Sequence, residues 1–181
     1  MSGLFRLLLL TLLAAGPLAA ADLSAKASAT AESPLAGTWR FNAARSTELS
    51  PWQDYTLTLA VSGDTVTISR SLGSGRRAFA DTMTIDLSRP DRVIPVTMWP
   101  DNRHLGAYIS DDHAKRVRAE WLDDGRILRL HTDLVLATQQ GDRAVNILSD
   151  YKVSANGAVL TLTELRSTRN RPVVYVFTRI P

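Results

Sequence analysis

Four tight-turn signals spaced along the chain constrain its fold more than any other feature of the sequence. They are Gly63-Asp64, Asp124-Gly125, Gly141-Asp142 and Asn156-Gly157, and each lies between segments in which apolar and polar residues alternate. Dipeptides of this kind supply the positive φ angles of two-residue β-hairpins. Because side chains alternate between the two faces of a strand, each turn also determines which residues lie opposite each other. The pattern predicts a long antiparallel sheet.

The segments between these turns predict about eight to eleven strands and little helix. After Trp39, no window longer than about ten residues has the 3.6-residue period of an amphipathic helix. Ser88–Asp91 and Trp99–Arg103 each carry Pro and Asp and are predicted loops. The expected strands are Gly37–Phe41, Tyr55–Val61, Val66–Leu72, Phe79–Leu87, Val93–Met98, Leu105–Ile109, Lys115–Leu122, Ile127–Thr138, Arg143–Val153, Ala158–Arg166 and Val173–Ile180.

The registers set by the four turns agree on one apolar face. Charged pairs such as Glu120 with Arg129 and Arg116 with Asp133 fall on the opposite face, where water can solvate them. On the apolar face the expected neighbours are Val61 and Val66, Leu59 and Ile68, Leu57 and Arg70, Tyr55 and Leu72, Trp121 and Leu128, Ala119 and Leu130, Val117 and Thr132, Leu136 and Ile147, Leu134 and Ser149, Thr132 and Tyr151, Leu130 and Val153, Val153 and Leu160, Tyr151 and Leu162, Ser149 and Glu164, and Ile147 and Arg166.

A sheet of this many consecutive strands leaves unpaired edges unless it closes on itself. We therefore expect an all-β fold, an antiparallel meander β-barrel with an apolar interior. An outer-membrane barrel is the competing arrangement, in which the charged face would have to meet lipid at about 2–4 kcal/mol per Arg or Lys near the midplane.

The first residues have the pattern of a secretory signal peptide. Arg6 precedes an apolar run from Leu7 to Ala15, Gly16-Pro17 interrupts it, and Ala19–Ala21 offers small residues for cleavage. The run is shorter than the ~20 residues of a membrane-spanning helix, although an uncleaved anchor is the alternative. We expect a signal peptide at residues 1–21, a flexible segment at 22–34 and one barrel domain at 35–181, in a periplasmic or secreted protein with no transmembrane segment in its mature chain.

Composition excludes several classes of site. The chain has no Cys, so disulfides and thiolate metal sites are excluded. Removing residues 1–21 takes away one Arg and leaves 20 basic and 18 acidic side chains, a balance too mild to predict nucleic-acid binding. There is no Gly-x-Ser-x-Gly elbow and no phosphate-binding Gly-rich loop. His104, Asp111, Asp112 and His113 lie close together in sequence, but their spacing matches no metal motif.

Several polar residues share the parity of the apolar face and are expected to point inward. They are Arg70, Ser149, Glu164 and Arg166, and Asp81 joins them if Phe79, Met83 and Ile85 also face inward. A charge inside a barrel is costly unless it is paired. Either Arg70 pairs with Asp81 and Arg166 with Glu164, or these groups await the polar end of a ligand. The candidate ligand-binding residues are Arg70, Arg166, Glu164, Tyr151, Tyr55 and Trp121.

Two segments resemble lipocalin-like proteins, and together they extend the likeness over most of the predicted domain. Gly37-Thr38-Trp39-Arg40-Phe41-Asn42 resembles the Gly-x-Trp opening of the first lipocalin strand. The closing hairpin from Val153 to Leu162, with Val174–Arg179, is similar to that of small exported bacterial lipocalin-like proteins. The resemblance implies structural roles for Gly37 and Trp39 and places Arg179 over the Trp39 ring, where a guanidinium gains cation–π attraction and can bind carbonyls.

The sequence therefore predicts an exported binding protein that holds a small apolar or amphipathic molecule inside its barrel, without a cofactor or a catalytic site. One alternative is a protein-interaction module whose interior is filled by its own side chains. Another is an enzyme that uses the same interior. The residues do not identify the ligand or the oligomeric state.

Overall fold

The computed structural model of this chain describes residues 33–47, 52–89, 91–96, 99 and 107–181. The predicted signal peptide, most of the segment that follows it, and His104 lie outside the described residues. The described part is all-β, as predicted, and its one helical element is the short 3₁₀ turn η1 (Ala43–Arg45). The strands are β1 (Gly37–Phe41), β2 (Asp54–Ser62), β3 (Thr65–Ser74), β4 (Arg77–Asp86), β5 (Arg92–Pro95), β6 (Tyr108–Ile109), β7 (Ala114–Leu122), β8 (Ile127–Thr138), β9 (Gly141–Val153), β10 (Val159–Arg166) and β11 (Val173–Ile180).

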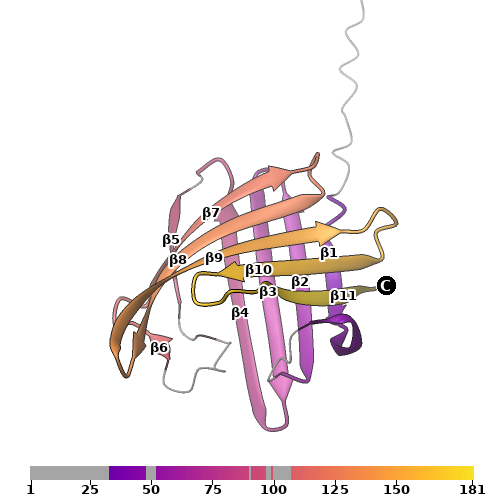
Figure 1. Cartoon of the computed structure of the whole chain (residues 1–181). Coiled ribbons are helices and arrows are strands. Elements are labelled where there is room, and N and C mark those ends of the chain that lie inside the picture. The colour runs from indigo at the N-terminus through magenta and orange to yellow at the C-terminus, as the bar shows by residue number, and fades with distance from the viewer. Residues whose placement is uncertain (1–32, 48–51, 90, 97–98, 100–106) are drawn as a thin grey trace, which may run out of the picture. The chain divides into compact units, whose positions relative to one another are not determined.

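These strands form one antiparallel meander that is nearly closed. Their order is β4-β3-β2-β1-β11-β10-β9-β8-β7-β5, so β1 joins β2 on one side to β11 on the other. Short β6 pairs with β8 beside the end of β7. Figure 1 shows β7 to β11 crossing over β2 to β4. The predicted barrel class is confirmed, and among the described residues no ladder joins β4 to β5.

Three of the four predicted hairpin registers are correct. Around Gly63-Asp64, Val61 lies opposite Val66 and the other three expected pairs also form. The turns at Asp124-Gly125 and Asn156-Gly157 likewise give the expected neighbours. The hairpin at Asp124-Gly125 has a four-residue loop in which Asp123, Asp124 and Gly125 all have positive φ. The centre of that turn, and hence the register, is as predicted.

The register predicted for Gly141-Asp142 is wrong by four residues. The turn lies at Gln139 and Gln140, because Thr138 pairs with Gly141 and its hydroxyl donates a hydrogen bond of 2.7 Å to the Gly141 carbonyl. The positive φ of Gly141, 99°, is used at the first residue of β9. A shift of four residues is even, so every side chain stays on its predicted face. The pairs are Leu136 with Arg143, Leu134 with Val145, Thr132 with Ile147 and Leu130 with Ser149.

Alternation of burial along the strands defines the inside of the barrel. In β9, Val145, Ile147, Ser149, Tyr151 and Val153 are buried, and the residues between them are more exposed. The largest of the almost completely buried side chains, which expose no more than 2% of their surface, include Trp39, Phe177, Leu57, Leu59, Ile68, Leu128, Leu160 and Leu162. Burying such side chains contributes about 1.5–3 kcal/mol each. The shared apolar interior is therefore the main source of stability in a fold without disulfides.

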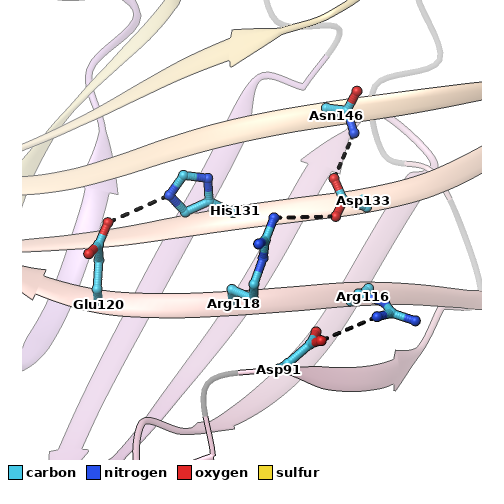
Figure 2. Close-up of polar contacts among 7 residues, drawn as sticks. All are labelled: Asp91, Arg116, Arg118, Glu120, His131, Asp133 and Asn146. Carbon is cyan, nitrogen blue, oxygen red and sulfur yellow. Dashed lines mark hydrogen bonds and ion pairs between the residues drawn. The ribbon is translucent and has the colours of Figure 1, made fainter.

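The outward face of β5, β7, β8 and β9 carries charge, and its ion pairs differ from those expected (Figure 2). The cross-strand registers of Glu120 with Arg129 and of Arg116 with Asp133 are correct. The side chains nevertheless turn to other neighbours, because long side chains also reach diagonal positions. The observed contacts are Arg116 with Asp91 at 3.2 Å, Arg118 with Asp133 at 3.8 Å, His131 with Glu120 at 3.6 Å, Asn146 with Asp133 at 2.7 Å and Arg129 with Asp150 at 2.8 Å.

One end of the barrel is held by Arg179 and Trp39. The guanidinium lies 4.1 Å from the centre of the Trp39 ring, the arrangement that the lipocalin resemblance implies. The Arg179 Nε, Nη1 and Nη2 atoms donate hydrogen bonds to the carbonyls of Gly157, Ala36 and Pro34 at 2.7, 2.7 and 2.6 Å. The Trp39 Nε1 donates to the Leu35 carbonyl at 3.1 Å. This cluster joins the chain before β1 to the last strand and to the β9–β10 turn.

Replacing Gly37 by alanine is expected to destabilise the fold by about 2 kcal/mol, twice the cost of the same change at Gly63. Both residues have positive φ, 134° and 55°, so both substitutions strain the backbone by about 1 kcal/mol. A Cβ on Gly37 would also collide with the Arg179 guanidinium, whereas a Cβ on Gly63 would meet no atom within 4 Å. Urea unfolding of both variants measures the difference, and equal losses would contradict it.

Candidate ligand cavity

The barrel encloses a cavity of about 330 Å³. Apolar side chains from β3, β4, β5, β8 and β9 form much of its wall, among them Ile68, Phe79, Met83, Ile94, Leu130, Leu134 and Ile147. Its polar lining comes from Arg70, Asp81, Lys115, Thr132, Ser149, Tyr151, Glu164 and Arg166. All of these residues lie at inward positions that the alternation of the strands dictates. A concave site with apolar walls and a few convergent polar groups is the usual form of a small-molecule site.

Arg70 and Asp81 form an ion pair on adjacent strands at one side of the cavity. They are cross-strand neighbours in the β3–β4 ladder, and the Arg70 Nε donates to Asp81 Oδ1 at 2.7 Å while Nη2 contacts Oδ2. Burial, the largest single cause, would lower the pKa of Arg70, but the hydrogen bonds and charge of Asp81, together with the nearby Tyr55 and Tyr151, raise that pKa overall. This bidentate pairing satisfies the carboxylate and leaves part of the guanidinium facing the cavity.

Arg166 and Glu164 form a second ion pair, on β10. The Arg166 Nε donates to Glu164 Oε2 at 3.1 Å, and Nη2 contacts the same oxygen. The side chains are only 7% and 15% exposed, so this pair is more buried than the first. Burial, as the largest cause, lowers the pKa of Arg166. The Arg166 guanidinium also lies 5.6 Å from the centre of the Trp99 ring, so an aromatic face covers it.

Lys115 is the third cation of the cavity. It lies on β7 opposite Leu134 of β8 and Ile94 of β5, two apolar residues of the wall. Among the described residues, no carboxylate forms an ion pair with its ammonium group. Burial, with a smaller contribution from the nearby Arg70 cation, lowers the pKa of Lys115 to about 8. The described cavity thus contains three cationic side chains and two carboxylates.

Two buried tyrosines lie next to the charged group. Burial raises the pKa of Tyr151, and it raises the pKa of Tyr55 to about 12 even though the Arg70 guanidinium opposes the shift. Both phenols therefore remain protonated near neutral pH and can donate or accept hydrogen bonds. The Tyr55 ring packs edge-on against the Phe177 ring, with 5.0 Å between the two ring centres.

Four of the six predicted ligand-binding residues line the cavity. They are Arg70, Arg166, Glu164 and Tyr151. Tyr55 packs among the rings of Phe41, Tyr175 and Phe177 and does not line the cavity. Trp121 packs partly buried against the core, also away from the cavity. In the His- and Asp-containing stretch that matches no metal motif, Asp112 accepts a 2.6 Å hydrogen bond from Ser110 and one of 3.3 Å from the backbone of Ala114.

Sequence reasoning missed Lys115 and Trp99 as cavity residues. Lys115 has the same parity as Val117 and Ala119, which lie on the inward face as predicted. The alternation of faces was therefore sufficient to predict that Lys115 also points inward. Trp99 lies in a segment that the sequence predicts as a loop, to which no periodicity applies. It lines both this cavity and a neighbouring pocket of about 370 Å³ that includes Ala107, Leu136 and Val145.

Replacing Lys115 by methionine is expected to stabilise the protein by about 1–2 kcal/mol at neutral pH. In an unfolded chain a lysine stays charged up to about pH 10.4, whereas burial in the fold lowers the pKa of Lys115 to about 8. Between these values the unfolded chain binds more protons, so wild-type stability rises with pH. Below about pH 8 the full cost of charging Lys115 is present.

The gain from Lys115→Met should therefore shrink as the pH rises from about 8 to about 10. Urea unfolding at several pH values measures this trend. The control is Lys152→Met, which removes a lysine from an exposed position on the outer face of β9 and should not give the trend. A gain independent of pH would mean that Lys115 carries no charging cost.

No helix among the described residues is long and apolar enough to span a membrane. No family model matches the sequence, and no curated protein matches it. Solved structures that are similar to this chain include the following two. The REP1-NXSQ fatty acid transporter has a TM-score of 0.47 and 11% identity over 81% of this chain and 96% of that chain. Secretory abundant heat soluble protein 4 from Ramazzottius varieornatus has a TM-score of 0.48 and 9% identity over 82% of this chain and 96% of that chain.

Proposed function

We propose that this chain is an exported binding protein for a small amphipathic molecule. The observation that carries the proposal is the cavity itself, which is lined both by apolar side chains and by the cations Arg70, Lys115 and Arg166. An apolar body would occupy the volume beside Ile68, Leu130 and Leu134. A polar or anionic end would meet the cations, which exceed the carboxylates by one.

The size of the cavity supports a ligand over a filled interior. At about 330 Å³ it lies within the range of about 300–1,000 Å³ that is typical of small-molecule sites. A barrel that works only through its outer surface gains nothing from such a hollow, because each unfilled volume forfeits packing. Ion pairs inside the barrel are costly to bury, and the polar end of a ligand would interact with these charges.

We propose binding instead of catalysis because the carboxylates in the cavity are both engaged. Asp81 is held by Arg70 and Glu164 by Arg166, so neither is positioned as an isolated general acid or base. Tyr55 and Tyr151 have raised pKa values and hold their protons at neutral pH. The described groups thus favour retention of a molecule over its conversion.

Export is proposed from residues 1–21 alone, because their charge, apolar run and small residues have the order of a signal peptide. Expression of the full chain in a bacterium should yield a processed product that begins near Asp22 in the periplasmic fraction. N-terminal sequencing of that product tests the proposal, and an unprocessed chain retained in the cells would contradict it.

Titration with 1-anilinonaphthalene-8-sulfonate tests the binding proposal, because this probe combines an apolar ring system with an anion. Folded protein should give a saturable fluorescence increase at one site. Thr132→Trp, which places an indole at a cavity-lining position of β8, should abolish it. The matched control is His131→Trp on the same strand, since His131 faces outward and its side chain is 43% exposed.

Circular dichroism must show native β structure in both variants, because this probe also binds loosely packed states. No saturable signal in the folded wild-type protein, or equal binding by Thr132→Trp, would contradict the proposed function.

A further inference from the structure

We propose that Lys115 captures apolar aldehydes that enter the cavity by forming an imine with them. This inference rests on the proposed binding function and goes beyond it, because it names a ligand class and a covalent step. Three observations support it: Lys115 lines the cavity, its neighbours across the ladders are apolar, and no carboxylate among the described residues forms an ion pair with it.

The position of Lys115 is set by the β-ladders. It is inward on β7, in line with buried Val117 and Ala119, and its neighbours across the ladders are Ile94 and Leu134. Its side chain lines the same cavity as Ile68, Phe79 and Leu130. An apolar chain lying along that wall would bring its end group into the reach of the amine.

Burial, more than the charges around it, favours the neutral form of Lys115. Arg70 and Asp81 face it from β3 and β4, and Glu164 faces it from β10. The two carboxylates are each bound by an arginine, so their attraction for the ammonium is partly cancelled. Burial lowers the pKa of Lys115 to about 8. Each unit by which the pKa is lowered gives roughly tenfold more free amine at neutral pH, so the free-amine fraction of Lys115 should exceed that of an ordinary lysine by roughly a few hundredfold.

Free amine in an apolar pocket beside another cation is the known condition for a nucleophilic lysine. The Nζ lone pair attacks the carbonyl carbon, and a C–N bond forms as the carbonyl π electrons move to oxygen. The two protons of the amine are transferred to that oxygen, which leaves as water when the C–O bond breaks. The product is a C=N bond, and no oxidant or reductant is needed. The apolar side chains beside Lys115 would limit the access of water to this imine.

The chain supplies its own control. It has three lysines, Lys26, Lys115 and Lys152, and Lys26 lies outside the described residues. Lys152 is exposed on the outer face of β9, opposite Thr161 of β10 and Ile127 of β8. It resembles Lys115 in being a lysine within a strand, but water solvates its ammonium group. Any preference of an aldehyde for Lys115 over Lys152 therefore reports on the cavity.

The experiment uses the folded full-length protein and octanal at neutral pH, with sodium cyanoborohydride added to reduce the imine to a stable amine. Peptide mass spectrometry should locate the added octyl group on Lys115 in at least about tenfold excess over Lys152. Octan-1-ol, which has the same chain but cannot form an imine, should suppress labelling of Lys115 and leave Lys152 unaffected. Lys115→Arg, which keeps the positive charge, should lose the preferred adduct.

Equal labelling of Lys115 and Lys152, or labelling of Lys115 that octan-1-ol does not suppress, would overturn the inference. Wild-type protein unfolded in urea provides a second measurement that does not depend on a variant folding, because there the preference for Lys115 should disappear. If the anilinonaphthalene probe still binds saturably while no adduct forms, this inference fails and the proposed function stands. If both signals are absent from folded protein, the proposed function fails as well.

Discussion

Replacing Trp39 by alanine is expected to lower the free energy of unfolding by about 3–5 kcal/mol, the largest loss we expect from any single substitution here. The Trp39 side chain is completely buried, and its Nε1 donates a hydrogen bond to the Leu35 carbonyl. Removal of the indole leaves a cavity among the core side chains and takes away the aromatic face under Arg179. Urea unfolding followed by circular dichroism measures the loss.

Trp121→Ala is the matched control, because Trp121 is the same residue type, lies at an inward position of β7 and is only partly buried. Its loss should be clearly smaller. The double variant Trp39→Ala/Arg179→Ala should be less damaging than the sum of the two single variants by about 1 kcal/mol, since the residues are in contact. Equal losses for the two tryptophans would mean that the Trp39 cluster does not hold the closed end of the barrel.

The fold was predictable because its local signals are independent of one another and agree. Gly63 and Gly157 have positive φ in the structure, as their turn types require, and the strands beside them pair as expected. The Gly141 turn was misplaced because glycine supplies a positive φ equally well inside a turn or at the start of a strand. The hairpin centred on Gly75 and Arg76 was not foreseen, since Gly75-Arg76 is not one of the favoured turn dipeptides.

The sequence predicted only those features of the site that follow from the alternation of side chains between the two faces of a strand. Arg70, Glu164 and Arg166 follow from the alternation of faces, and so do their partners in the two ion pairs. Sequence could not choose between pairing and ligand binding, because that depends on side-chain distances. It also could not place Trp99 over Arg166, because no strand register links these two residues. Tyr55 was wrongly expected to line the cavity, because a residue that points inward can pack in the core and still not reach the cavity.

Replacing Asp81 by alanine is expected to lower the free energy of unfolding by about 2–3 kcal/mol, below the usual cost of breaking a fully buried pair because each side chain is about a quarter exposed. The change leaves the Arg70 guanidinium without its carboxylate and removes an anion that raises the pKa of Lys115. Three cations then share the cavity with one carboxylate, so Lys115 should titrate at a still lower pH than in the wild-type protein.

Arg70→Met should cost less than Asp81→Ala, because the Lys115 cation remains near the carboxylate and can take part of the guanidinium's role. The double variant Arg70→Met/Asp81→Leu should recover most of the loss, since apolar side chains then fill the space of the pair without a charge to solvate. Urea unfolding of the three variants and the wild-type protein gives the coupling energy, expected at about 1–3 kcal/mol. If Arg70→Met proves the more damaging single change, the positive charge of the cavity is not in excess, and the basis for an anionic or carbonyl ligand there is lost.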